Sequence, residues 1–190
     1  MMKKSLLILM TLVGFPLTAM AHPGHEAVGF MSGVLHPLTG LDHLLVMLAI
    51  GFWAARAPTE NRFQIPTLFI IFLLIGLTMG AFMTTSSMVE LGIAVSVLSM
   101  GLILFLSARI SALWQLMLTS MFGLMHGFVH GQELVLAEHG FMAILGLTLT
   151  TAGLLAVGFF LGRQKDRIGQ YLQSLLISVL AVAGAFFLIA

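Results

Sequence analysis

Cysteine is absent from the 190-residue chain, and charged residues make up only 8% of it. The lack of cysteine excludes disulfides, iron–sulfur clusters and thiolate metal sites, so a metal site must use imidazole, carboxylate, thioether or backbone oxygen. The scarcity of charge, beside a hydrophobic content of 59%, excludes a water-facing surface, because soluble domains carry about a quarter charged residues. The net charge of +1 argues against nucleic acid as a partner. The composition therefore predicts an all-α integral membrane protein in a lipid bilayer.

The first 21 residues have the pattern of a secretory signal peptide. Lys3 and Lys4 precede a short apolar stretch, which is followed by an A-x-A segment at 19–21. We expect cleavage after Ala21, which would leave residues 22–190 as a single transmembrane domain that begins in the periplasm. The alternative is a first transmembrane helix that is retained.

Six apolar runs follow, and together they predict a compact bundle of six transmembrane helices. The expected spans are 33–55, 63–83, 88–108, 110–131, 141–162 and 170–189. With the N-terminus outside, every basic residue after position 21 falls in a cytoplasmic loop, as the positive-inside rule requires. The predicted topology therefore has both termini in the periplasm and places the protein in a bacterial inner membrane.

Polar residues interrupt the first and fourth spans at the same predicted depth. The segment "HPLTGLDH" (36–43) begins the first span, and "GLMHGFVHGQE" (123–133) ends the fourth. Because the two spans run in opposite directions, both segments lie in the outer half of the membrane. The residues that we expect to meet there are His36, Asp42, His43, His126, His130 and Glu133. Ionisable groups inside spans normally face the bundle interior and line an ion or proton path.

Imidazole and carboxylate groups of this kind suit borderline divalent metals such as Ni²⁺, Co²⁺ and Zn²⁺. The alternative is that the histidines only pack helices together through hydrogen bonds to backbone carbonyls. Glu90, near the outer end of the third span, is either an auxiliary ligand or proton carrier, or a side chain that reaches the interface. His22 and His25, at the expected mature N-terminus, either capture metal or belong to a frayed tail.

Glycine and proline mark two further features of these spans. Gly123, Gly127 and Gly131 form a smooth strip along the fourth span, against which another helix can pack closely. Pro37 and Gly40 weaken the first span where the polar residues lie. Either they break the helix there, or the helix simply begins at this point with proline in its first turn.

The two polar segments resemble the motifs of the HupE/UreJ family of nickel and cobalt permeases. "HPLTGLDH" matches the pattern H-P-x-x-G-x-D-H in full, and "MHGFVHGQE" (125–133) matches F-H-G-x-A-H-G-x-E except at Met125 and Val129. The resemblance implies a secondary transporter, not an enzyme, that takes up Ni²⁺ and also Co²⁺. It implies that the six polar residues named above contact the transported metal, with no permanently bound cofactor. It also implies that the metal supplies hydrogenase or urease maturation, which would bring metal-delivery or maturation proteins as partners.

Two other functions compete with this interpretation. An intramembrane Zn²⁺-dependent hydrolase would use several histidines, an acid and an activated water, although no H-E-x-x-H segment is present. A permease for copper or zinc is the second, prompted by the 14 methionines.

Overall fold

The computed structural model describes residues 29–83, 87–135, 139–164 and 166–189, and these ranges contain seven α-helices and no strand. The prediction of an all-α protein is therefore confirmed for this part of the chain. The helices are α2 (Phe30–Thr39), α3 (Leu41–Arg56), α4 (Gln64–Gly80), α5 (Ser87–Leu106), α6 (Ala112–Val135), α7 (Gly140–Gly162) and α8 (Arg167–Ile189), with a short 3₁₀ turn, η1 (Ser107–Arg109), after α5.

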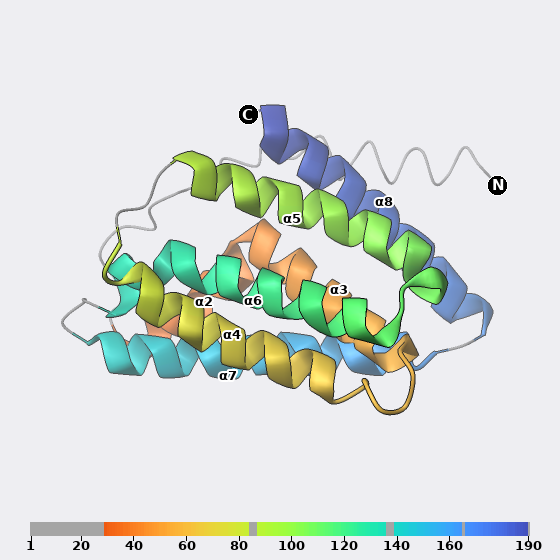
Figure 1. Cartoon of the computed structure of the whole chain (residues 1–190), viewed down its shortest axis with the longest axis horizontal. Helices are drawn as coiled ribbons and strands as arrows, with labels where there is room; N and C mark the ends of the chain where they lie inside the picture. The colour runs from red at the N-terminus through yellow and green to blue at the C-terminus, as the bar shows by residue number, and fades with distance from the viewer. Residues whose placement is uncertain (1–28, 84–86, 136–138, 165, 190) are drawn as a thin grey trace.

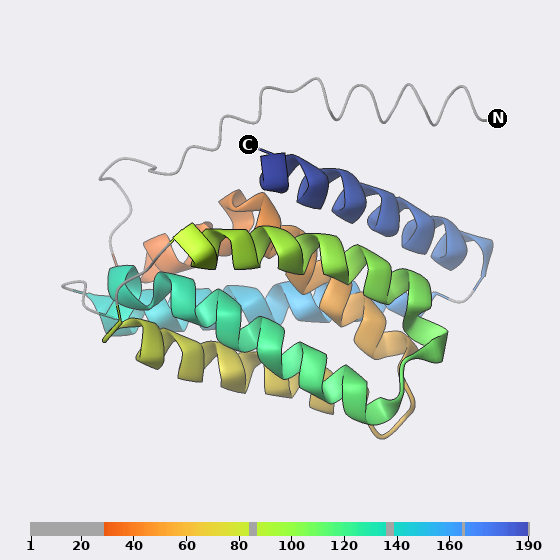
Figure 2. The same ribbon diagram turned by 45° about the horizontal axis from the view of Figure 1, so that its top comes forward.

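The helices form a layered bundle in which successive helices from α3 onward reverse direction (Figures 1 and 2). α5 and α8 lie on one side, α4 and α7 on the other, and α2, α3 and α6 lie between them. The turns after α3, η1 and α7 all lie at one end of the bundle, on the right in Figure 1. These turns and the helix ends beside them carry Arg56, Arg62, Arg109, Arg163 and Arg167, so we call it the basic end.

Three of the described helices are long and apolar enough to cross a membrane: Ala112–Gly131 within α6, and the whole of α7 and α8. The α2–α3 pair qualifies as a fourth if it is counted as one broken span. α4 and the segment Leu91–Leu106 of α5 are apolar but shorter. Each predicted span thus falls on a helix or on the helix pair, whereas the number six and the periplasmic location of the termini stay predictions.

α3 is the central helix of the bundle, and almost every residue from Val46 to Ala55 is buried. A helix that is apolar on all sides has to be enclosed by others, and the sequence "VMLAIGFWAA" has no polar face. Small residues let its neighbours approach: a Cβ on Gly51 would overlap the carbonyl oxygen of Leu155 in α7. The position of α3 matters for the site because its first turn carries Asp42 and His43.

The first predicted span is broken at Gly40. α2 and α3 meet there at an angle of 80°, and the backbone of Gly40 is extended, with φ −78° and ψ 110°. Pro37 lies inside α2, which begins seven residues earlier at Phe30, so the alternative of a helix that starts at the proline is wrong. The chain bends within the segment "HPLTGLDH", between its two histidines.

The glycine strip of the fourth span packs against α4, as the sequence predicted for a close helix neighbour. A Cβ on Gly123, Gly127 or Gly131 would overlap the backbone of α4, at the carbonyl oxygens of Phe69, Leu73 and Leu77 respectively. The pairing advances by four residues on both helices at each step, so α4 and α6 run parallel with their backbones in contact. Such contacts are typical of helix pairs in membranes, where packing replaces the hydrophobic effect.

Arg56 joins three helices at the basic end. Its guanidinium donates to the carbonyl oxygens of Gly162 and Gln164, where α7 ends, and to Gly169 O in α8. It also donates to Gln173 Oε1 at 2.6 Å. Free carbonyls at a helix end attract a cation, so this side chain stabilises the end of α7 and fixes α8 beside it.

Candidate metal centre

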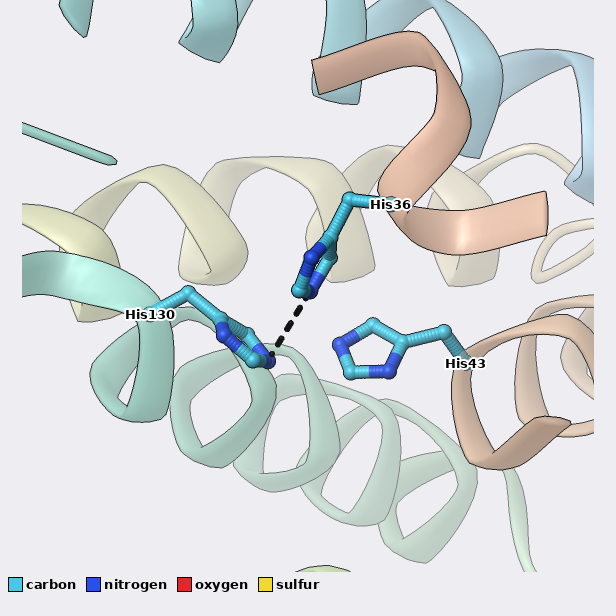
Figure 3. A group of neighbouring side chains, drawn as sticks. All are labelled: His36, His43 and His130. Carbon is cyan, nitrogen blue, oxygen red and sulfur yellow. Dashed lines mark hydrogen bonds between the residues drawn. The ribbon is translucent and has the colours of Figure 1, made fainter. Parts of the chain in front are cut away.

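Three histidines from separate helices converge inside the bundle. His36 comes from the last turn of α2, His43 from the first turn of α3, and His130 from α6 (Figure 3). One ring nitrogen from each lies within 4.8 Å of the others. Figure 3 shows the rings turned toward a common centre beside the break between α2 and α3. The break therefore allows His36 and His43, from one segment, to lie beside His130, which is 87 positions beyond His43.

The spacing of the rings suits a shared ligand. His36 Nε2 and His130 Nε2 are 3.3 Å apart, close enough for one ring to donate a hydrogen bond to the other. Two imidazoles bound to one tetrahedral ion at about 2.05 Å would have their nitrogens about 3.3 Å apart. The ring of His43 lies 5.0 Å from that of His36 and 4.8 Å from that of His130, measured between centroids. His43 thus faces both other members of the group.

Asp42 contacts the ring of His43. Its Oδ2 lies 3.0 Å from His43 Nδ1, in the geometry of an ion pair more than of an aligned hydrogen bond. His43 is 2% exposed, and its Nε2 has no hydrogen-bond partner among the described residues. A carboxylate on one ring nitrogen orients the ring and raises the basicity of the other nitrogen, as around many metal-bound histidines. Asp42 is therefore placed to position His43, and its predicted role as a metal contact stays a prediction.

His126 lies one turn before His130 on α6 and is completely buried. Its Nδ1 donates to the carbonyl oxygen of Phe122 at 2.9 Å, because a carbonyl can only accept. The proton is thereby fixed on Nδ1, and Nε2 keeps its lone pair without a hydrogen-bond partner in the described structure. The ring of His126 lies 5.3 Å from that of His43. His126 is thus adjacent to the three-histidine group, on the side nearer the basic end, and its contact with the group is through His43.

The remaining predicted residues fall outside what the structure describes. Glu133 lies within α6 and Glu90 within α5, but their side chains are not among the described ones. His22 and His25, and with them the expected signal-peptide cleavage site, also lie outside the described residues. Their roles as ligand, auxiliary group and capture site stay predictions.

Gly40 has a steric role that the sequence did not indicate. A Cβ at this position would lie 3.0 Å from Asp42 Oδ1 and 3.3 Å from His43 Nδ1. The sequence pointed to Gly40 only as a weak point of the helix. This role could have been inferred from the position of Gly40, two residues before Asp42. At a helix start, a side chain commonly approaches the backbone two residues before it.

We expect Gly40→Ala to weaken metal binding while leaving the fold intact. Alanine tolerates the observed φ and ψ, but its methyl group would displace Asp42 by a few tenths of an ångström. Partners that orient metal ligands typically contribute about 10–100-fold to affinity, so a loss of about tenfold is expected. Calorimetric titration of the purified protein with Ni²⁺ would measure it, with the unfolding midpoint as the control. Unchanged affinity would mean that Asp42 does not position His43.

Comparison with known proteins places the chain in a family. A sequence profile of the HupE / UreJ protein family matches residues 9–187. The chain belongs to the HupE/UreJ family. It is also 31% identical to "Protein HupE" of Rhizobium leguminosarum bv. viciae over 178 residues, which cover 93% of each chain. No solved structure matches it.

Membership of the HupE/UreJ family confirms the resemblance found in the two polar segments. The family is one of transporters, and its match here accords with apolar helices of membrane-spanning length. The histidine group of this HupE/UreJ chain is built from both segments: His36 and His43 come from the first, and His130 comes from the second. The structure thus brings together, inside a membrane-type helix bundle, the two parts of the sequence that carried the resemblance.

Proposed function

We propose that the protein is a secondary transporter that takes up a divalent transition metal, with Ni²⁺ as the main substrate and Co²⁺ as a second. The metal would bind between the α2–α3 pair and α6, in the outer half of the membrane. The observation that carries the proposal is the convergence of His36, His43 and His130 inside the bundle. The metal is the transported substrate, and the protein needs no resident cofactor.

The chemistry of the group supports a metal of this class. Neutral imidazoles are ligands of choice for Ni²⁺, Co²⁺ and Zn²⁺, and no cysteine is present to favour a softer ion. The His36–His130 separation of 3.3 Å already fits two ligands of one ion. The widest separation in the group is 4.8 Å, so a bound ion would draw the third ring inward by rotation of its side chain. Burying His43, whose Nε2 has no hydrogen-bond partner in the described structure, is unfavourable without a ligand.

The broken helix supports transport in preference to storage. His36 precedes the bend at Gly40 and His43 follows it, so a change in the 80° angle alters the distance between two ligands. A hinge between ligands can therefore bind the ion in one state and release it in another, as in transporters with discontinuous helices. A +2 ion that moves inward gains about 4.6 kcal/mol per 100 mV of membrane potential, which is enough to drive uptake.

The distribution of charge supports an orientation. Arginines gather at the basic end, while the break and its histidines lie away from that end, on α2 and the start of α3. By the positive-inside rule, the basic end would face the cytoplasm of a bacterium, and both termini would face the periplasm. Metal released at the basic end would be available to metal-delivery or maturation proteins in the cytoplasm.

Transport in a purified system tests the proposal. Full-length protein in liposomes that contain a metal-sensitive dye should admit Ni²⁺, and Co²⁺ more slowly, when a membrane potential, negative inside, is applied. Parallel assays with Zn²⁺ and Cu⁺ would establish the selectivity, and protein-free liposomes would supply the background. If only Cu⁺ entered the liposomes, the proposed substrate would be wrong. If none of the four ions entered, a transport function would be refuted.

A further inference from the structure

The interior face of α6 continues from the histidines toward the basic end as a line of buried polar side chains. Thr119 lies seven residues before His126, and Gln115 lies eleven before it. At 100° per residue, both fall within about 20° of the direction of His126. Both are buried, at 0% and 3% exposure. Gly123, Gly127 and Gly131, which contact α4, point to a different side of the helix. The polar line is therefore centred on a different side of α6 from the glycine strip, although the ring of His126 also lies 6.1 Å from that of Phe69 in α4.

Thr119, like Thr151 in α7, differs from three other threonines of the bundle. Thr39, Thr78 and Thr148 each donate their hydroxyl to the carbonyl oxygen four residues earlier, which satisfies it within its own helix. Thr119 Oγ1 is buried and has no hydrogen-bond partner among the described residues. An unpaired buried hydroxyl is unfavourable to folding, and the same hydroxyl could have been paired locally, as in the other three. This unpaired oxygen lies about 10 Å from His126 along α6, toward the basic end. It is therefore available to contact a transported ion.

Phe122 lies between Thr119 and His126 along α6. It lies on the same face of α6, is 1% exposed, and its carbonyl oxygen holds the proton of His126 Nδ1. On the far side, Gln115 Oε1 accepts from Asn61 Nδ2 at 3.2 Å, and the same nitrogen donates to Ala112 O. This amide pair joins α6 to the turn after α3 at the basic end. From the histidines toward the basic end, this face of α6 therefore carries a ring nitrogen, an apolar side chain, an unpaired hydroxyl and a hydrogen-bonded amide pair.

We propose that this face of α6 is the route by which the metal leaves the histidine group, with Thr119 as an oxygen ligand between His126 and the basic end. His126 receives the ion from His43, its neighbour in the group, and Phe122 is the barrier that must move aside. The inference rests on the proposed transport function. It adds a residue outside both polar segments to the machinery, and it gives His126 a role in onward transfer.

A purely structural role for Thr119 leads to the opposite expectation. Valine has nearly the same shape, and removing an unpaired buried hydroxyl should leave the protein equally stable or more stable. If Thr119 only fills space, Thr119→Val would then transport as well as the wild type. If Thr119 is a ligand on the route, the same substitution lowers flux without harming the fold or the outer site.

The test compares Thr119→Val with Thr119→Ser and with the control Thr78→Val, whose hydroxyl is on the exposed side of α4. Full-length proteins in liposomes are assayed for Ni²⁺ influx, and the same proteins in detergent for Ni²⁺ affinity and unfolding midpoint. We expect Thr119→Val to lower influx about tenfold, as loss of one polar contact at a barrier would. Affinity should be unchanged, the midpoint unchanged or higher, and Thr119→Ser and Thr78→Val close to wild type.

Wild-type influx in Thr119→Val would overturn the route. So would a Thr119→Val protein that loses affinity or stability along with influx, because that pattern assigns Thr119 a structural role. A Thr119→Ser protein as slow as the valine variant would have the same consequence, since serine keeps the hydroxyl. Failure of the transport function itself is separate, because it appears as absent influx in the wild-type arm.

Discussion

Replacing His43 with alanine is expected to abolish metal binding and transport together. Among the described histidines, His43 is the one whose ring lies within about 5 Å of three others, those of His36, His126 and His130. It is also the residue that Asp42 contacts. Removing it deletes a ligand, leaves the Asp42 carboxylate without its partner and separates His126 from the group. Because changes to the partners of ligands already cost about 10–100-fold, loss of the central ligand should lower Ni²⁺ affinity by about 100-fold or more.

The matched control is His139→Ala, which removes an exposed imidazole just before α7 and outside the histidine group. Ni²⁺ affinity by calorimetry and influx into liposomes would be measured for both variants beside the wild type. The helical circular dichroism and the unfolding midpoint would show that the His43 variant still folds. Equal affinity in the His43→Ala and wild-type proteins would remove the histidine group from the binding site. Loss of binding in both variants would mean that the effect of His43→Ala is not specific to the buried histidine group.

The meeting of the two polar segments could be predicted from the sequence because two independent patterns agreed on depth. Apolar runs gave the direction of each helix, and the arginines gave the orientation, so His43 and His130 were expected at one level. Residue spacing alone could not give the way in which His36 joins them. A separation of seven places His36 and His43 on one face of a straight helix, yet in the structure they lie on two helices at 80°.

The packing of the glycine strip, likewise, could be predicted from the sequence only in part. A repeat of glycine every four residues predicts that the backbone of another helix packs closely, because only the lack of a side chain allows such an approach. It does not identify that helix, since every predicted span is apolar enough to be the neighbour. α4 was therefore not predictable as the partner of α6. The unpaired hydroxyl of Thr119 was equally out of reach, because a threonine in an apolar helix normally bonds to its own backbone.

Replacing Gly127 with alanine is expected to be among the most destabilising single changes in the chain. The new Cβ would overlap the carbonyl oxygen of Leu73, and backbone atoms cannot move aside as a flexible side chain can. α4 and α6 would have to separate along their whole contact, which also includes Gly123 and Gly131. Overpacking typically costs 1–3 kcal/mol, and a clash with backbone belongs at the upper end, so we expect a loss of about 3 kcal/mol in the free energy of unfolding. Unfolding followed by circular dichroism in detergent would measure it.

Gly153→Ala provides the matched control, because a Cβ at Gly153 in α7 would meet nothing within 4 Å. That variant should be as stable as the wild type or slightly more stable, since alanine favours helix over glycine. The two substitutions add the same methyl group to a helical glycine, so any difference between them measures the contact with α4. Gly127 also lies between His126 and His130, and a displaced α6 would carry both rings with it. We therefore expect Ni²⁺ affinity to fall in Gly127→Ala and to stay unchanged in Gly153→Ala. Equal unfolding midpoints for the two variants would contradict the close packing of α4 and α6.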